Sequence, residues 1–463
     1  MITFARRYLL VALAWLVLRG WVVVLYGFPA AAAAWFGWSG AEWGVVGDVT
    51  YYRDSLDTLA SEGVEGTMVE YPVPALLLLW IPHAAIGLLG LGGDAFVVAV
   101  LVMAALTDLL FMMLLVLGRH GEHPRFGISG AEALWLVAVP ALGATAYARF
   151  DLFPGIMVGL AVLYAASRPK VAAAFAAFAT GAKYWPILVI PALAATRRAR
   201  KPVVVTVAIT GVALAGLSLA LGGWDRLMTP LGYQGDRGLQ IESVFATPAM
   251  VAWGHGSTDY VVDYTEWKAY DVSGPTVEAL LLAATIASVV GAALVIVWWV
   301  LAWRRLGGRR GEPPDGDPGS PTEETIVWLV LATVAAFLVT NKVLSPQYLL
   351  WLLPATAAGR VLLRGRARRR LGFWSVVLVA ATLLTHEIFP RMYGYMLTYN
   401  ETGSPRITEV LAWRNGLLLL LFLYAAWRTT RLLTFSAAVP TTAAEKVAIS
   451  GRHGRRRPEP SRS

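Results

Sequence analysis

Asp48 is the residue whose surroundings point most directly to acid–base chemistry, because it is an isolated carboxylate that follows a long apolar N-terminal segment. Apolar and aromatic residues recur after it at helical spacing, namely Val49, Tyr52, Leu56 and Leu59. This spacing predicts an amphipathic helix, and such a helix beside a membrane span is expected to lie in the interface. Asp48 is then either the N-cap of that helix or a catalytic carboxylate, and this stretch alone supports both interpretations equally.

Cations and other polar side chains are expected at the same end of the predicted membrane spans. Lys183 and Tyr184 lie at the tip of a predicted helical hairpin, where anion binding competes with a lysine that merely extends to the membrane interface. Arg149 has no evident structural role, whereas Asp151 is a plausible N-cap of the next span. The other candidate substrate-binding residues are Tyr52, Glu70, Tyr71, Arg237, Gln240, Glu242, Asn341, Lys342 and Gln347.

One carboxylate among several cations fits the displacement of a phosphate leaving group by a hydroxyl. The carboxylate would take the proton of the acceptor hydroxyl. The cations would stabilise the negative charge that develops on the departing phosphate. No Asp-x-Asp pair accompanies Asp48, so the sequence gives no reason to invoke a metal, and it indicates no cofactor.

The composition is that of a polytopic, all-α membrane protein. Of the 463 residues, 57% are hydrophobic and only 15% are charged, against about 25% charged residues in soluble domains. Apolar runs of about 20 residues, the length that crosses a bilayer as a helix, recur along the chain. The net charge of +9 does not indicate nucleic acid, because the basic residues cluster in short loops between spans, as the positive-inside rule describes.

The same rule predicts a multi-pass topology in the cell membrane with both termini in the cytoplasm. Residues 1–433 are expected to form one transmembrane domain of about 10–12 helices. Its outer loops are 34–94 and 223–275, its cytoplasmic linker is 304–324, and 434–463 is a disordered basic cytoplasmic tail. The candidate residues then gather on the extracytoplasmic face.

Two apolar segments do not fit simple crossings. If 72–91 or 171–196 crossed the membrane once, the basic loop after it would lie outside. Positive-inside sorting therefore favours a 72–91 segment that dips into the outer interface. It also favours two short helices within 171–196 that meet at a tip over 181–186, which is tolerated where protein or a cavity surrounds the break.

Charged residues at membrane depth are costly, so each is expected to have a partner or a function. Arg19 and Asp108 lie midway along two predicted antiparallel spans, which predicts a structural ion pair. In the second outer loop, Leu239 and Ile241 alternate with polar residues and predict a docked, strand-like piece.

Several motifs together carry a resemblance to a known family. They are an Asp soon after the first span, Tyr71-Pro72, Arg149-Phe-Asp151, Gly181-Ala-Lys183, Trp185-Pro186, Arg237-Gly-Leu-Gln-Ile-Glu-Ser243, Lys342-Val-Leu-Ser-Pro-Gln-Tyr348 and Arg414-Asn415. Over residues 8–430 the chain resembles the family-87 glycosyltransferases of the membrane-embedded C-type superfamily, which include mannosyltransferases that use polyprenyl-phosphate mannose.

The resemblance implies a helical bundle with extracytoplasmic loops and interfacial helices. It implies the inverting transfer of a hexose from a polyprenyl-phosphate donor to a hydroxyl of a glycolipid or glycan at the outer face of the bilayer. The expected hexose is mannose. Asp48 matches the family's general base, and one carboxylate suffices for direct displacement. The positions of Lys183 and Lys342 suit the donor phosphate.

The alternative function is transport or flipping of a lipid-linked anion. Such proteins usually have repeated halves and binding sites at the midplane. No internal repeat is visible here, and the polar groups are predicted at one face. A non-catalytic protein that binds polyprenyl phosphate is a third interpretation that the residues leave open.

Overall fold

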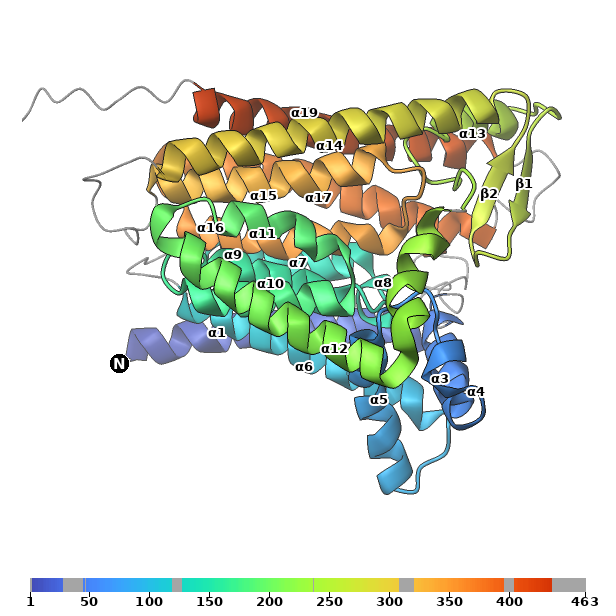
Figure 1. Cartoon of the computed structure of the whole chain (residues 1–463), viewed down its shortest axis with the longest axis horizontal. Coiled ribbons are helices and arrows are strands. Elements are labelled where there is room, and N and C mark those ends of the chain that lie inside the picture. The colour runs from blue at the N-terminus through green and yellow to red at the C-terminus, as the bar shows by residue number, and fades with distance from the viewer. Residues whose placement is uncertain are drawn as a thin grey trace, which may run out of the picture.

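The computed structural model describes residues 2–27, 45, 47–118, 127–235, 237–307, 320–394 and 404–434. These residues form a helical bundle with one two-stranded hairpin (Figure 1). Six of the described helices are long and apolar enough to cross a membrane. They are α6 (Ala95–Leu117), α12 (Arg197–Gly235), α14 (Val277–Gly307), α15 (Pro321–Thr340), α17 (Gly365–His386) and α19 (Pro405–Thr434). The prediction of an all-α, polytopic membrane protein is confirmed.

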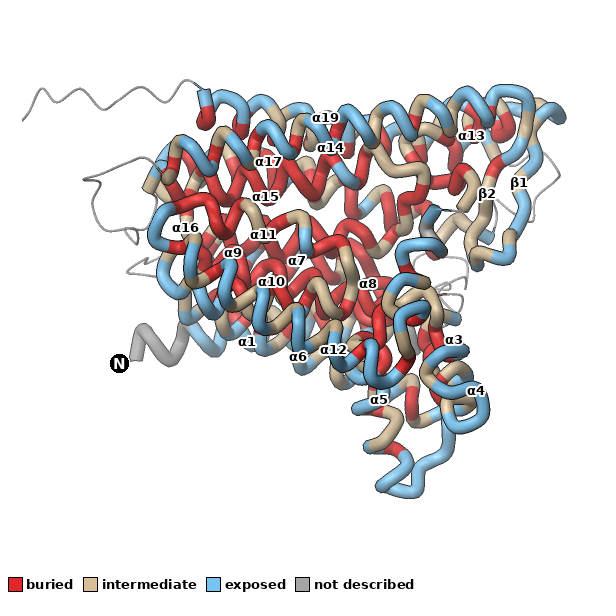
Figure 2. Tube along the Cα trace, in the orientation of Figure 1, coloured by how far each residue is buried: buried red, intermediate tan, exposed pale blue. Residues whose placement is uncertain are grey.

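The distribution of buried residues separates interior helices from lipid-facing ones (Figure 2). In α15, 89% of the apolar window is buried, against 11% in α12 and 17% in α14. A helix that is apolar on all sides belongs in a protein interior or in a bilayer. Here α15 lies in the interior, whereas α12 and α14 expose most of their apolar surface to the bilayer. Four shorter helices help to fill the interior, namely α7 (Gly130–Leu142), α9 (Leu152–Tyr164), α10 (Pro169–Ala182) and α16 (Leu353–Leu362).

The first helix, α1 (Ile2–Gly27), carries Arg19 into the bundle, where the predicted ion pair forms. Arg19 Nε lies 2.7 Å from Asp108 Oδ2, and both side chains are buried. Trp15, Trp135 and Tyr147 also donate to the Asp108 carboxylate, at 2.9, 2.5 and 2.5 Å. Because a buried charge is tolerated only when its partners satisfy it, this closed cluster is structural.

Three helices lie at one end of the bundle, which we call the Asp48 end. They are α3 (Gly47–Asp57), α4 (Leu59–Gly66) and α5 (Val73–Leu88). The predicted apolar face of α3 is buried at Val49, Tyr52 and Leu56, whereas Leu59 lies beyond the end of this helix and begins α4. Figure 1 shows α5 projecting across the direction of the bundle helices, so the 72–91 segment does not run with the spans. Its exposed Leu77, Trp80 and Ile81 suit an interface.

Segment 171–196 forms the predicted pair of short helical pieces. Helix α10 ends at Ala182, Lys183 is extended, and the chain resumes as η2 (Trp185–Val189) and α11 (Ile190–Leu193), both packed against α10. Arg200, just after the hairpin, donates to the Trp303 carbonyl near the last turn of α14, at the end remote from Asp48. The hairpin therefore returns the chain to the end where α10 began.

The second polar loop begins where α12 turns at Gly223, whose φ is +68°. It continues through α13 (Thr247–Gly254) and an antiparallel hairpin of β1 (Val261–Tyr264) and β2 (Tyr270–Ser273). The predicted strand-like piece is present, because Gln240 forms an isolated bridge with Asp271. The predicted linker 304–324 is helical at both ends, since α14 extends to Gly307 and α15 begins at Pro321. The tail 435–463, positions 28–44 and positions 308–319 lie outside the described residues.

Candidate active site

Asp48 and Arg149 form an ion pair at the Asp48 end of the bundle. Asp48 is the second residue of α3, and its side chain is 41% exposed. Arg149 follows the single turn α8 (Thr145–Ala148) in extended conformation, and its side chain is only 8% exposed. The Asp48 carboxylate is therefore reachable from solvent, whereas the guanidinium approaches it from the protein interior.

The Arg149 guanidinium is poorly compensated for a buried charge. It lies 5.3 Å from the centre of the Phe389 ring, and no described group accepts a hydrogen bond from its Nε. Burial lowers the pKa of Arg149 to about 10, opposed chiefly by the negative charge of Asp151. A cation in this state is electrostatically suited to an incoming anion, because little water screens it.

Lys183 and Asp151 form a second pair beside the first. Lys183 Nζ donates to both carboxylate oxygens of Asp151, at 2.8 and 2.7 Å, and Trp351 Nε1 donates to one of them at 2.6 Å. The lysine lies 5.6–5.8 Å from the ring centres of Tyr71, Tyr348 and Trp351. Asp151 lies at the predicted N-cap position of α9, but its carboxylate makes no cap bond. The lysine and the indole bind that carboxylate instead.

Two of the predicted tyrosines, the buried Tyr52 and the half-buried Tyr71, form a pair next to Lys183. The Tyr52 and Tyr71 hydroxyls lie 3.2 Å apart, and their rings meet edge to face at 5.9 Å between centres. Burial raises the pKa of both hydroxyls well above 10. They are therefore neutral hydrogen-bonding groups at physiological pH. Tyr184, at the hairpin tip, donates to the Leu227 carbonyl at 2.6 Å.

Sequence reasoning missed Lys268, which the β1–β2 hairpin brings to α3. Its backbone has a φ of +53°, and its Nζ lies 3.4 Å from the centre of the Tyr51 ring. Burial lowers the pKa of Lys268, and the negative charge of Glu70 opposes this effect. The only local signal was an aromatic-flanked turn between Tyr264 and Tyr270, which predicts a hairpin but not its docking partner.

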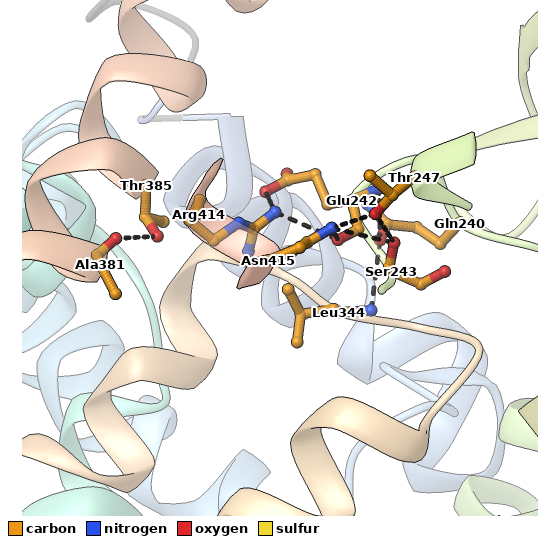
Figure 3. Close-up of polar contacts among 9 residues, drawn as sticks. All are labelled: Gln240, Glu242, Ser243, Thr247, Leu344, Ala381, Thr385, Arg414 and Asn415. Atoms are coloured by element: carbon orange, nitrogen blue, oxygen red, sulfur yellow. Dashed lines mark hydrogen bonds and ion pairs between the residues drawn. The ribbon is translucent and has the colours of Figure 1, made fainter. Parts of the chain in front are cut away.

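Glu242 is buried against Arg414, the arginine of the last predicted motif (Figure 3). Arg414 Nη2 donates to the Glu242 carboxylate at 2.9 Å and to its carbonyl at 3.1 Å. Burial raises the pKa of Glu242 to about 7, against the opposing charges of Arg414 and Arg149. Gln240 has an internal role, because its side-chain oxygen accepts from the backbone N–H groups of Glu242 and Leu344, each at 3.2 Å.

The remaining predicted residues form a group around Asp271. Burial raises the pKa of Asp271, and the positive charges of Arg237 and Lys342 oppose this effect. Lys342 Nζ also donates to the Gly235 carbonyl at 2.8 Å, and Asn341 Oδ1 accepts from the Val343 N–H at 3.0 Å.

Gln347 is half-buried in the first turn of η3 (Pro346–Trp351). Thus Lys342 and Lys183, both predicted to suit a donor phosphate, have different partners in the structure. Among the described residues, no three His, Asp or Glu side chains gather as a metal site.

A predominantly apolar cavity of about 200 Å³ lies between α5, α10 and α12. Its lining includes Pro72, Leu214, Leu227 and, at the hairpin tip, Tyr184 next to Lys183. The apolar cavity thus reaches the residue that follows Lys183, the cation that the sequence predicts to bind a phosphate.

The sequence model of glycosyltransferase family 87 matches residues 69–316, more than half of the chain. No match was found among curated proteins or among solved structures. The matched range contains Arg149–Asp151 and Lys183, whereas Asp48 and the motifs at 342–348 and 414–415 lie outside it. The family predicted from the motifs is confirmed by this match, and the chain is a membrane-embedded glycosyltransferase that belongs to glycosyltransferase family 87.

Proposed function

We propose that the protein transfers a hexose, specifically mannose, from a polyprenyl-phosphate donor to a hydroxyl of a glycolipid or glycan at the extracytoplasmic face. In this proposal Asp48 is the general base and the transfer inverts the anomeric centre. The observation that carries it is the Asp48–Arg149 pair, in which a solvent-reachable carboxylate meets a buried and incompletely compensated cation.

The reaction balances with one carboxylate. The acceptor oxygen forms a bond to the anomeric carbon while the bond between that carbon and the phosphate oxygen breaks. The electron pair of the broken bond leaves with the phosphate, and the hydroxyl proton passes to Asp48, which later releases it to water. Direct displacement of this kind needs no covalent intermediate and hence no second nucleophile.

Arg149 and Lys183 supply the positive charge that stabilises the departing phosphate. Arg149 can exchange its Asp48 partner for a donor phosphate, because Asp48 is the exposed member of the pair. That exchange frees the carboxylate to accept the acceptor proton once the donor is bound. Lys183 stays oriented by its bidentate contact with Asp151.

The apolar cavity beside Tyr184 supports a lipid-linked donor. An isoprenoid chain needs an apolar path that leads to the phosphate-binding cations, and the cavity between α5, α10 and α12 is lined by Tyr184, the residue that follows Lys183 in the chain. The cavity also faces helices that expose apolar side chains toward the bilayer, such as Val212 on α12. A water-soluble nucleotide-sugar donor would gain nothing from this surface.

The experiment is a transfer assay with purified protein, radiolabelled polyprenyl-phosphate mannose and a lipid acceptor pool. We expect Asp48→Asn to lower turnover by at least about 10²-fold, the usual value of a general base. Asp54→Asn is the matched control, because Asp54 lies on the same helix and is 63% exposed. Wild-type turnover in Asp48→Asn would overturn the base assignment.

A further inference from the structure

A second cavity, of about 670 Å³, lies between α7 and α17 at the end of the bundle remote from Asp48. It begins at Gly130, the first residue of α7, whereas α7 leads at its other end through α8 to Arg149. The cavity is thus separated from the candidate active site by the length of α7, and the proposed reaction does not use it.

The walls of the cavity are the apolar faces of two neighbouring helices. Leu134 and Val137 of α7 face Val376 and Val379 of α17 across it. Val137 is 45% exposed and Val376 is 68% exposed, so the groove opens sideways toward the bilayer. These dimensions and this opening suit a hydrocarbon chain that enters from the membrane.

The mouth of the groove is lined by Arg360, Arg368 and Arg369. Arg360 Nε donates to the Gly130 carbonyl at 2.9 Å. A Cβ atom at Gly130 or at Gly372 would collide with the Arg360 guanidinium, so two glycines leave the space in which this side chain lies. The arginine is therefore held at the mouth of the groove by its surroundings.

No Asp or Glu is among the described residues that line the groove. Two acidic residues of neighbouring segments have partners outside the groove. Glu132 accepts from the Ser129 N–H at 2.8 Å in the capping box of α7. Glu324 lies 2.5 Å from Arg428 and 3.8 Å from Arg370. The mouth thus presents positive charge above an apolar slot, which is complementary to an amphiphile with a negative head.

We propose that this groove binds an anionic phospholipid of the surrounding bilayer. Its phosphate lies at Arg360 and Arg369, where charge-assisted hydrogen bonds hold it, and one acyl chain lies between α7 and α17. Basic pockets between membrane helices bind anionic headgroups in this way. A zwitterionic lipid fills the same slot but gains less from these two arginines.

The test uses the full chain in nanodiscs, and it exploits the absence of cysteine. A bimane label at Val376→Cys reports on the groove, and a label at Phe373→Cys reports on an exposed position of the same helix that does not line it. We expect phosphatidylglycerol with brominated acyl chains to quench the Val376 label more than brominated phosphatidylcholine does. At Phe373 the two lipids should quench equally. Equal quenching by the two lipids at Val376 would overturn the proposal.

Arginine variants in the Val376→Cys background provide the second arm. Arg369→Gln should lower the preference for phosphatidylglycerol about fivefold, because one arginine near an anionic headgroup contributes about 1 kcal/mol. Arg366→Gln is the matched control, an exposed arginine in the first turn of the same helix that does not line the groove. An equal loss in both variants indicates nonspecific surface charge and refutes a defined site.

Discussion

Replacing Arg149 with methionine should stabilise the protein and strongly slow transfer. Burial lowers the pKa of Arg149 from 12.5 to about 10. Since one pKa unit corresponds to about 1.4 kcal/mol, keeping the guanidinium charged costs the folded state about 3 kcal/mol. The unfolded chain binds this proton with ordinary affinity, so the cost is present at every pH below about 10.

Little of that cost is recovered from the partner. Asp48 is 41% exposed, and pairs that are open to solvent contribute about 0–1 kcal/mol. Methionine has a similar length and no charge to desolvate. We therefore expect Arg149→Met to raise the free energy of unfolding by about 2 kcal/mol and Tm by roughly 2–6 °C. Removing a cation from the departing phosphate should lower turnover by about 10²–10³-fold.

The measurement is thermal unfolding in detergent at pH 7 together with the transfer assay. Arg226→Met is the control. Arg226 is also buried, but its guanidinium donates hydrogen bonds to backbone carbonyls of the segment 64–69. That variant should lose stability. If Arg149→Met also unfolds at a lower temperature than the wild type, the argument that Arg149 is kept at a cost to stability is wrong. If it is stable and still turns over normally, Arg149 is not in the site.

Three further predictions concern the other charged pairs. Asp108→Asn should lower the free energy of unfolding by about 3–5 kcal/mol, because it leaves Arg19 buried without its counter-charge. A Tm within 1–2 °C of the wild-type value would contradict the structural role of this cluster. The pKa of Glu242 is raised from 4.5 to about 7 in the folded state. Its protonation therefore adds about 3 kcal/mol to the free energy of unfolding below pH 4.5, and this contribution is lost as the pH rises through about 7. Glu242→Gln should therefore have a flatter profile of Tm against pH, and superimposable profiles would refute this. Lys183→Gln should lower transfer about 10²-fold, a result to be compared with Lys342→Gln, which should reduce it less.

Much of the fold could be predicted because hydrophobic periodicity and the cost of a buried charge depend on where residues lie along the chain, which the sequence gives directly. The apolar face of α3 follows from spacing alone. The Arg19–Asp108 pair follows from the depth of each residue in its span, although the two are 89 positions apart. The break at Lys183 follows from the distribution of basic loops. Each of these inferences needs a helix direction and a membrane, and no other tertiary information.

The site could be predicted as a set of residues but not as a set of pairs. Asp151 has the sequence of a cap, yet its carboxylate is bound by Lys183 from 32 positions away and by Trp351 from 200 positions away. The preference of Asp151 for capping its helix is outweighed by these two partners, which only the packed structure brings near its carboxylate. Lys268 was missed for the same reason, because its place beside Tyr51 depends on how the hairpin docks.

The completeness of each charge's partner set distinguishes structural from functional groups better than burial does. Asp108 is fully buried and accepts from an arginine, two indoles and a phenol, so it has no capacity left for a ligand. Arg149 is nearly as buried, yet its Nε has no described acceptor and its partner Asp48 is open to solvent. A cation left unsatisfied next to an accessible carboxylate costs stability, as an isolated structural pair would not. That cost is reasonable if the missing partner is a transient anion, and a departing phosphate is the anion that the proposed reaction supplies.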